Sequence, residues 1–264
     1  MNQSALLTVF SSGAADPAPP YTPADEFTGG KNGWLFDGSA GQSDFLQSAG
    51  GAVAVNGDPL GSVEDLSGNG NDVLQTTGGA KPVCNVSGGI RAITTADGKS
   101  ISAALAVNMP PARTMVWVFR GGTLSSDATY LLQELAAGGT WDWLYPTNVP
   151  NAYMYDDNYT GTNLVVTPAW GQTVIFVMKK WFDGGLWKLT GTSYNAAGVL
   201  VATDTFTFAS GHGHSVKTID IGFPPGTPQN TMYIPFAFGV EGTISDEADM
   251  VAYCVSKFGA WSQA

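Results

Sequence analysis

The chain has 264 residues, of which 44% are hydrophobic, 11% aromatic and only 12% charged, and it contains 34 glycines. A chain of this length can bury one large core, and this composition is typical of short strands joined by tight turns. The formal net charge of −11 disfavours binding to nucleic acid or to an anionic membrane surface, and no apolar stretch is long enough to span a bilayer.

Residues 1–30 are predicted to form an extended arm, followed by one folded domain at residues 31–264. The arm is rich in alanine, proline, serine and glycine, a composition that cannot bury enough surface to fold alone. Its apolar run at residues 5–10 favours docking on a partner subunit, with a disordered tail as the alternative. No basic region precedes that run, so no secretion signal is expected.

The remaining chain shows short β-branched and aromatic runs separated by Gly, Asn, Asp and Pro, as in an antiparallel sandwich. Two runs, 115–119 and 174–178, are almost continuously apolar and are predicted to be central strands. Strands are expected at 52–55, 90–94, 114–120, 130–135, 173–179, 186–194, 199–208 and 219–223. The Asp183-Gly184 pair predicts a hairpin that makes Trp181 and Trp187 cross-strand neighbours.

One helix is predicted near the C-terminus, with Ser245 as its N-cap and Lys257 in its last turn. Its apolar positions, Cys254 among them, recur at helical spacing and are expected to pack on the sandwich. The chain has two cysteines, Cys84 and Cys254, which are predicted to be free core thiols. A disulfide that closes the sandwich is the alternative.

Three segments resemble, in this order, parts of concanavalin A-like, laminin-G-like modules of bacterial and bacteriophage proteins. They are Gly33-Trp34-Leu35-Phe36-Asp37, the Ser-Gly-Asn-Gly-Asn segment within residues 65–75, and the strand and helix at residues 239–259. The resemblance covers about residues 31–261 and implies an all-β, antiparallel two-sheet jelly-roll sandwich with a short C-terminal helix. It departs at residues 93–101, where relatives often carry two adjacent acids after an Asp-Gly pair. This chain keeps Asp97-Gly98 but lacks the two acids, which puts a ligand or ion site there in doubt.

The phage copies of this module look like structural parts of virions. The resemblance therefore implies a non-enzymatic virion protein, such as a head spike, fibre, tail or decoration subunit. Its arm would attach to other virion subunits, and its lectin-like domain would face outward for host attachment. A homo-oligomer is expected. A stand-alone carbohydrate-binding module is the alternative function.

The loop at residues 65–72 supplies four hard oxygen donors, which is the ligand chemistry that calcium uses. They are Asp65, Asn69, Asn71 and Asp72. The alternative is a turn in which Asn and Asp side chains bond to their own backbone while Gly takes a positive φ. Calcium is the only cofactor that the sequence suggests.

An aromatic stretch supplies the candidate carbohydrate site. Sugars present apolar C–H faces and hydroxyl rims, so aromatic platforms flanked by polar groups suit them. Alternation places Trp141, Trp143 and Tyr145 on one face of a strand, and Tyr153, Tyr155 and Asp157 on one face of another. Core packing or a subunit interface is the alternative for either set.

Catalysis is not expected from this sequence. Glycosidases need two carboxylates on one face, and no such pair occurs within a single strand, where Glu134 stands alone and Asp156 and Asp157 alternate. No Gly-x-Ser-x-Gly elbow occurs, and the two histidines, His212 and His214, lie in a glycine-flanked turn. Two ligands rarely suffice for zinc, so a solvent-exposed loop is expected there. A glycoside hydrolase or lyase is the third hypothesis, and it needs an acid pair that the sequence does not show.

Overall fold

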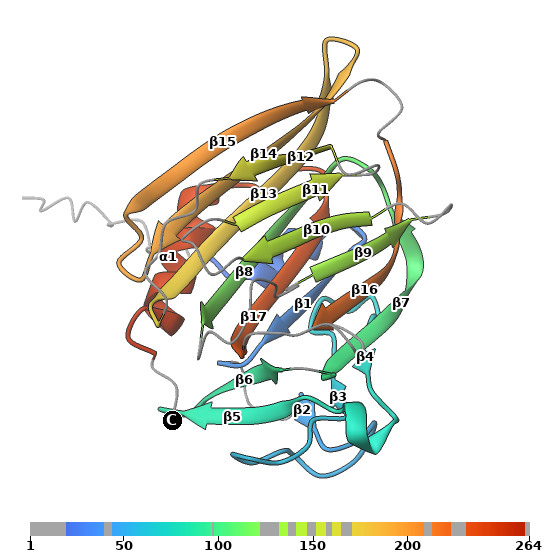
Figure 1. Cartoon of the computed structure of the whole chain (residues 1–264), viewed down its shortest axis with the longest axis vertical. Coiled ribbons are helices and arrows are strands. Elements are labelled where there is room, and N and C mark those ends of the chain that lie inside the picture. Colours follow the sequence, from blue (N-terminus) through green and yellow to red (C-terminus); the bar gives the residue numbers. More distant parts are fainter. Residues whose placement is uncertain are drawn as a thin grey trace, which may run out of the picture.

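The computed structural model describes residues 20–39, 44–96, 98–121, 132–136, 141–146, 152–156, 160–164, 171–208, 213–222 and 231–261. For the strands between residues 132 and 164 it describes the backbone only. These parts form two antiparallel sheets that pack face to face, with one α-helix behind them (Figure 1). The predicted all-β two-sheet sandwich with a short C-terminal helix is confirmed.

One sheet has eight strands in its described part. They are β1 (Gly33–Asp37), β5 (Val83–Ser87), β6 (Ile90–Thr95), β8 (Arg113–Gly121), β13 (Thr173–Asp183), β14 (Leu186–Asn195), β15 (Leu200–Phe208) and β17 (Met232–Glu241). Their order is β15-β14-β13-β8-β17-β6-β5, and β1 pairs with β17 beyond the segment that β6 pairs.

The other sheet has nine described strands. They are β2 (Phe45–Leu46), β3 (Ser62–Val63), β4 (Val73–Leu74), β7 (Ser100–Met109), β9 (Leu132–Ala136), β10 (Trp141–Pro146), β11 (Ala152–Asp156), β12 (Thr160–Leu164) and β16 (Val216–Gly222). Their order is β12-β11-β10-β9-β16-β7-β4-β3-β2. Two short 3-10 turns, η1 (Pro23–Phe27) and η2 (Gly78–Ala80), complete the elements alongside the helix α1 (Glu247–Phe258).

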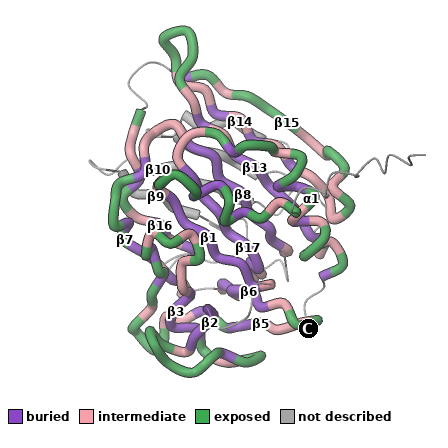
Figure 2. The backbone as a smooth tube through the Cα atoms, turned by 180° about the vertical axis from the view of Figure 1, so that it is seen from behind, coloured by how far each residue is buried: buried purple, intermediate pink, exposed green. Residues whose placement is uncertain are grey.

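Strands β8 and β13 are buried on both faces, as their continuous apolar runs predict. Met115 and Trp117 of β8 belong to the core between the two sheets, whereas Val116 and Val118 belong to a second core beneath α1. Figure 2 shows the buried course of β8, β13 and β17 through the middle of the molecule. A strand covered on both faces needs apolar residues at every position, which explains the loss of alternation.

Several strand predictions are confirmed, and others differ from the structure. Residues 52–55 form no strand, because only Val53 makes an isolated bridge, to Leu46. Two ten-residue strands, β7 and β17, were not predicted along their length. Strand β16 begins at Val216, earlier than residue 219.

The predicted hairpin between β13 and β14 is confirmed, but not its tryptophan pair. Gly184 and Gly185 form its two-residue turn with φ angles of +61° and +82°. This turn pairs Asp183 with Leu186, so Phe182 lies opposite Trp187, with ring centroids 5.2 Å apart. Trp181 instead lies opposite Lys188, so the predicted Trp181–Trp187 pair is wrong.

Asp246, not Ser245, caps helix α1. The Asp246 side chain accepts hydrogen bonds from the backbone N–H groups of Ala248 and Asp249. Ser245 bonds instead to the buried carboxylate of Glu26, donating its N–H over 2.9 Å and its Oγ over 2.5 Å to Oε1. Either residue type favours an N-cap, and the long-range partner of Ser245 decides between them.

The segment before β1 packs on the sandwich. The ring of Phe27 packs at a tilt against that of Phe238, with centroids 5.5 Å apart, and Tyr21 packs against the core beneath α1. Residues 20–30 are thus attached to the side of the molecule that carries α1, although the predicted arm extends to residue 30. Residues 1–19 lie outside the described residues, so the arm itself stays a prediction.

Both cysteines are free and buried, as predicted. Cys84 lies in the core between the sheets, whereas Cys254 lies in the core beneath α1. Because the eight-stranded sheet separates the two cores, the thiols cannot pair. Burial raises the pKa of the Cys84 thiol to about 11. No helix among the described residues is long and apolar enough to cross a membrane.

Candidate functional site

The nine-stranded sheet has a face turned toward the core and an outer face. The burial of alternate residues on β7 and β16 distinguishes the two. Ile219 and Ile221 of β16 are fully buried in the core between the sheets. The residues that alternate with them, Thr218 and Asp220, are only half-buried. Ser102 lies directly opposite Asp220 on β7. Thr218, Asp220 and Ser102 therefore hold positions on the outer face.

The strand register shows which residues of β9, β10 and β11 lie on the same outer face. Asp220 lies opposite Gln133, Gln133 lies opposite Trp143, and Trp143 lies opposite Tyr155. Directly opposite residues of an antiparallel pair share a face, so these residues form one row across the sheet. The neighbouring pairs are Tyr145 with Tyr153 and Trp141 with Leu135.

Five aromatic residues thus occupy positions on the outer face of this sheet, which we call the aromatic face. They are Trp141, Trp143, Tyr145, Tyr153 and Tyr155. Alternation predicted two separate sets, and the register joins them on the side opposite the core. A glycan site and a subunit interface are the two uses that suit such a face. Asp157, the sixth predicted residue, lies outside the described residues.

Asp220 is a residue of this face that the sequence reasoning missed. It is half-buried, and burial raises the pKa of its carboxyl group, while a hydrogen bond with Ser102 opposes the shift. The alternation of Ile219, Asp220 and Ile221 could have placed it on an outer face. Its neighbours on β9 and β10 could not be predicted, because strand order and register depend on non-local pairing.

The core face of the same strands carries a row of acids. Glu134 lies opposite Ile219 and also opposite Asp142, so Glu134 does not stand alone as the sequence suggested. Asp156 follows Tyr155 and lies beside Asp142 when the register is continued by one step. All three positions share the face of the buried Ile219, which is the face turned toward the other sheet.

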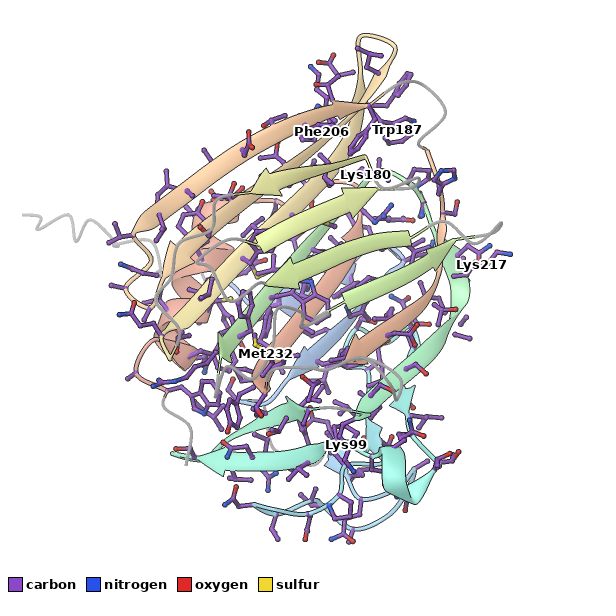
Figure 3. The ribbon with its side chains drawn as sticks, viewed as in Figure 1. Lys99, Lys180, Trp187, Phe206, Lys217 and Met232 are labelled. Carbon is purple, nitrogen blue, oxygen red and sulfur yellow. The ribbon has the colours of Figure 1, made fainter. Side chains whose placement is uncertain are left out.

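Two buried cations hold positions on the facing sheet. Lys180 and Arg113 lie opposite each other on β13 and β8, and each side chain is 2% exposed. They continue the alternation of Met178 and Met115, which belong to the core between the sheets. Figure 3 shows Lys180 toward the same end of the eight-stranded sheet as Trp187 and Phe206. Acid positions on one core face and buried cations on the facing sheet are complementary in charge.

The loop predicted to bind calcium is held together by its own hydrogen bonds. Oδ1 of Asp65 accepts the N–H groups of Leu35 and Ser67, each over 2.9 Å. Oδ2 accepts the hydroxyl of Ser67 over 2.7 Å and the N–H of Asn71 over 2.9 Å. Asp72 accepts the N–H of Asp65 over 2.7 Å.

The two asparagines of this loop link the sheets. Asn71 donates its amide to the carbonyl of Gly33 on β1 over 2.7 Å and accepts the N–H of Ala106 on β7 over 2.8 Å. Asn69 donates to the same Gly33 carbonyl over 3.1 Å. Gly68 and Gly70 take φ angles of +82° and +72°, which only glycine adopts readily. The Ser-Gly-Asn-Gly-Asn segment therefore stabilises the sandwich by linking a strand of each sheet.

The donors around Asp65 and a calcium ion would compete for the same carboxylate oxygens. A calcium ion at Asp65 would have to replace four donors that the chain already supplies. Within the described part of the chain, no three His, Cys, Asp or Glu residues lie close enough together to hold a metal ion. Of the two histidines, His212 lies outside the described residues, and the carbonyl of His214 accepts a hydrogen bond from Arg113 over 3.3 Å.

An open groove of about 630 Å³ lies between α1 and the turn that joins β14 to β15. Its lining is mainly apolar, with Gly198 on one side and Val251 and Val255 on the other. At one end Tyr194 donates a hydrogen bond to Glu247 over 2.5 Å, and Lys179 forms an ion pair with the same carboxylate. Its polar groups therefore bond to one another, and the groove presents no unsatisfied charge to a ligand.

Solved structures share this fold at low sequence identity. Domain 4 of AbnA, a GH43 extracellular arabinanase from Geobacillus stearothermophilus solved with arabinotriose, matches at a TM-score of 0.50 and 14% identity, over 72% of this chain and 92% of that chain. An arabinofuranosidase complexed with arabinofuranosyl-alpha-1,2-xylobiose matches at 0.55 and 14%, over 78% and 52%. The ligand-binding domain of botulinum neurotoxin serotype D, with N-acetylneuraminic acid, matches at 0.54 and 12%, over 72% and 47%.

These similarities establish the fold. The chain spans about half the length of the arabinofuranosidase and neurotoxin chains that it matches. No protein-family model matches the chain, and no curated protein matches its sequence. The lectin-like sandwich is thus confirmed as a fold shared with carbohydrate-binding and glycosidase proteins, whereas none of these similarities concerns a bacteriophage protein.

Proposed function

We propose that this chain is a non-enzymatic glycan-binding domain whose site is the aromatic face of β10 and β11. The observation that carries the proposal is the register, which gathers five aromatic positions on the side of the sheet opposite the core. Aromatic rings stack on the apolar faces of sugars, and the adjacent Gln133 and Asp220 positions offer hydrogen-bonding groups to hydroxyls. Two of the structural neighbours, domain 4 of the arabinanase and the ligand-binding domain of the neurotoxin, were solved in complex with sugars, which supports this use of the fold.

The distribution of carboxylates supports binding without catalysis. Retaining glycosidases hold two carboxyl groups about 5 to 5.5 Å apart beside the scissile bond. On the described strands β7, β16 and β9 to β12, the outer face carries one carboxylate, Asp220. The acids that do lie side by side, Glu134 and Asp142, are on the core face.

Substituting Trp143 tests the glycan site. We expect Trp143→Ala to weaken glycan binding at least about tenfold, because the loss of a central stacking ring removes a large share of the binding energy. Binding is measured by calorimetry with glycans found on an array of neutral and acidic sugars. Phe182→Ala, at an exposed aromatic residue of the other sheet, is the matched control and should bind like the wild type. No binding to any glycan, or full binding by Trp143→Ala, would contradict the proposal.

A second candidate function is that of a bacteriophage virion subunit that displays this domain. It is favoured by the Ser-Gly-Asn-Gly-Asn segment within residues 65–75, which is one of the segments that carry the family resemblance. It is also favoured by the position of the N-terminal segment, because Tyr21 and Phe27 pack on the α1 side while the aromatic face is on the opposite side of the sandwich. An arm attached there would leave the aromatic face directed away from the particle.

Truncation tests the arm. We expect the full chain to form an oligomer and residues 20–264 to be monomeric in light scattering, because the apolar run at residues 5–10 would be the docking segment. The cut is placed before Tyr21 because Glu26 and Phe27 are part of the sandwich. Equal masses for the two proteins would remove the arm from self-association.

A further inference from the structure

The aromatic face has an unusual charge pattern, with one carboxylate and no cation among its central positions. From β7 to β12 the row that contains Asp220 reads Ser102, Asp220, Gln133, Trp143, Tyr155 and Gly161. The next row contains Ala104, Thr218, Leu135 and Trp141. Neither row contains a lysine, an arginine or a histidine.

The nearest basic residue on this sheet lies at its margin. Lys217 is exposed where the register of β16 shifts between Val216 and Thr218 (Figure 3). It is three residues from Asp220, a separation of about 10 Å along a strand. Asp220 is two strands from Trp143, about 10 Å across the sheet, with Gln133 between them. A sugar that stacks on Trp143 and extends over Gln133 would therefore reach this carboxylate, whereas Lys217 is farther along β16.

Asp220 is suited to accept hydrogen bonds from sugar hydroxyls. A carboxylate has two acceptor oxygens and can bond to two adjacent hydroxyl groups at once. Asp220 is half-buried and its only described side-chain partner is Ser102, so it retains acceptor capacity. A hydrogen bond to a charged group is stronger than a neutral one, and more so where water is partly excluded.

The same carboxylate repels an anionic ligand. Two like charges within a few ångströms at a partly desolvated site disfavour binding strongly. Sialic and uronic acids carry a carboxylate on the sugar ring, and a glycan that extends from Trp143 over Gln133 would bring such a group close to Asp220. The net charge of −11 acts in the same direction.

We infer that the aromatic face selects neutral glycans and rejects acidic ones, and that Asp220 is the residue that makes this distinction. The inference rests on the proposed glycan-binding function. It is opposite to what the neurotoxin neighbour with its bound N-acetylneuraminic acid would suggest. The difference follows from the residues on this face, because a shared fold at 12% identity does not fix ligand charge.

Paired glycans test the inference with the full chain. The probes are a neutral oligosaccharide that binds and the same oligosaccharide with one terminal sialic acid, titrated by calorimetry at pH 7.5. We expect the neutral form to bind at least about tenfold more tightly. Asp220→Asn should lower this preference at least about tenfold, because it weakens the bonds to hydroxyls and removes the repulsion. Asp204→Asn is the matched control, since it changes the net charge equally at an exposed site of the other sheet and should leave the preference unchanged.

The outcomes separate this inference from the proposed function. Glycan binding that depends on Trp143 but favours the sialylated form would overturn the inference and leave the proposed function standing. The same holds if Asp220→Asn keeps the wild-type preference, or if Asp204→Asn lowers it equally. Absence of binding to every glycan would overturn both.

Discussion

Replacing Lys180 by methionine is expected to lower the free energy of unfolding by about 3 to 5 kcal/mol, which is a large part of the stability of a typical domain. Lys180 is 2% exposed and holds a position on the core face of β13, beside Arg113. The facing sheet places Glu134 and Asp142 on its own core face. Methionine keeps the length of the side chain but removes its charge, so we expect an acid at these facing positions to lose its counter-charge.

Denaturant unfolding of matched variants measures this effect. Lys179→Met is the control, because Lys179 is the adjacent residue, points to the opposite face and forms a half-exposed ion pair with Glu247. We expect it to cost less than about 1 kcal/mol. Adding Asp142→Asn to Lys180→Met should restore part of the lost stability. A Lys180→Met protein as stable as the wild type would show that no buried acid depends on this lysine.

The sequence predicted the centre of the sandwich best, because local pattern and burial agree there. The continuous apolar runs of β8 and β13 indicate that both faces of these strands are buried, and the predicted helix α1 packs over one of these faces. Strand β7 was missed because alanine and serine fill many of its positions and weaken the strand signal. Strand β17 was missed along most of its length because Pro235 interrupts it, at the irregularity between Tyr233 and Phe236.

The candidate site was predicted in pieces. Alternation placed Trp143 and Tyr145 on one face of their strand and Tyr153 and Tyr155 on one face of theirs, but it contains no information about pairing between strands. The register pairs Trp143 with Tyr155 and Tyr145 with Tyr153, and through β9 it adds Asp220 from a strand 65 residues beyond Tyr155. The row of acids on the core face was not predicted for the same reason, since Glu134 and Asp142 become neighbours only through the pairing of β9 with β10.

The segment at residues 65–72 shows how one local pattern can serve two chemistries. Oxygen donors on a glycine-rich loop suit calcium, and they suit equally a loop that bonds to its own backbone. Sequence spacing cannot separate these, because the deciding partners come from distant residues. The N–H of Leu35 and the carbonyl of Gly33 are both on β1, more than 30 residues before the loop ends.

Replacing Asp65 by alanine is expected to lower the free energy of unfolding by about 3 kcal/mol, equally with calcium and with a chelator. The substitution removes both oxygens that accept the N–H groups of Leu35, Ser67 and Asn71. It leaves these donors without their partner and loosens the link between β1 and β7 that Asn71 makes. The melting temperature and the denaturant midpoint are measured in both solutions.

Asp72→Ala is the matched control, because it removes an exposed carboxylate that accepts one hydrogen bond, from the N–H of Asp65. We expect it to cost about 1 kcal/mol. If calcium raised the melting temperature of the wild-type protein and had no effect on Asp65→Ala, the loop would be a calcium site and its hydrogen bonds would describe the metal-free form. Equal losses in both solutions would establish that the carboxylate of Asp65 stabilises the sandwich through the backbone of its own chain.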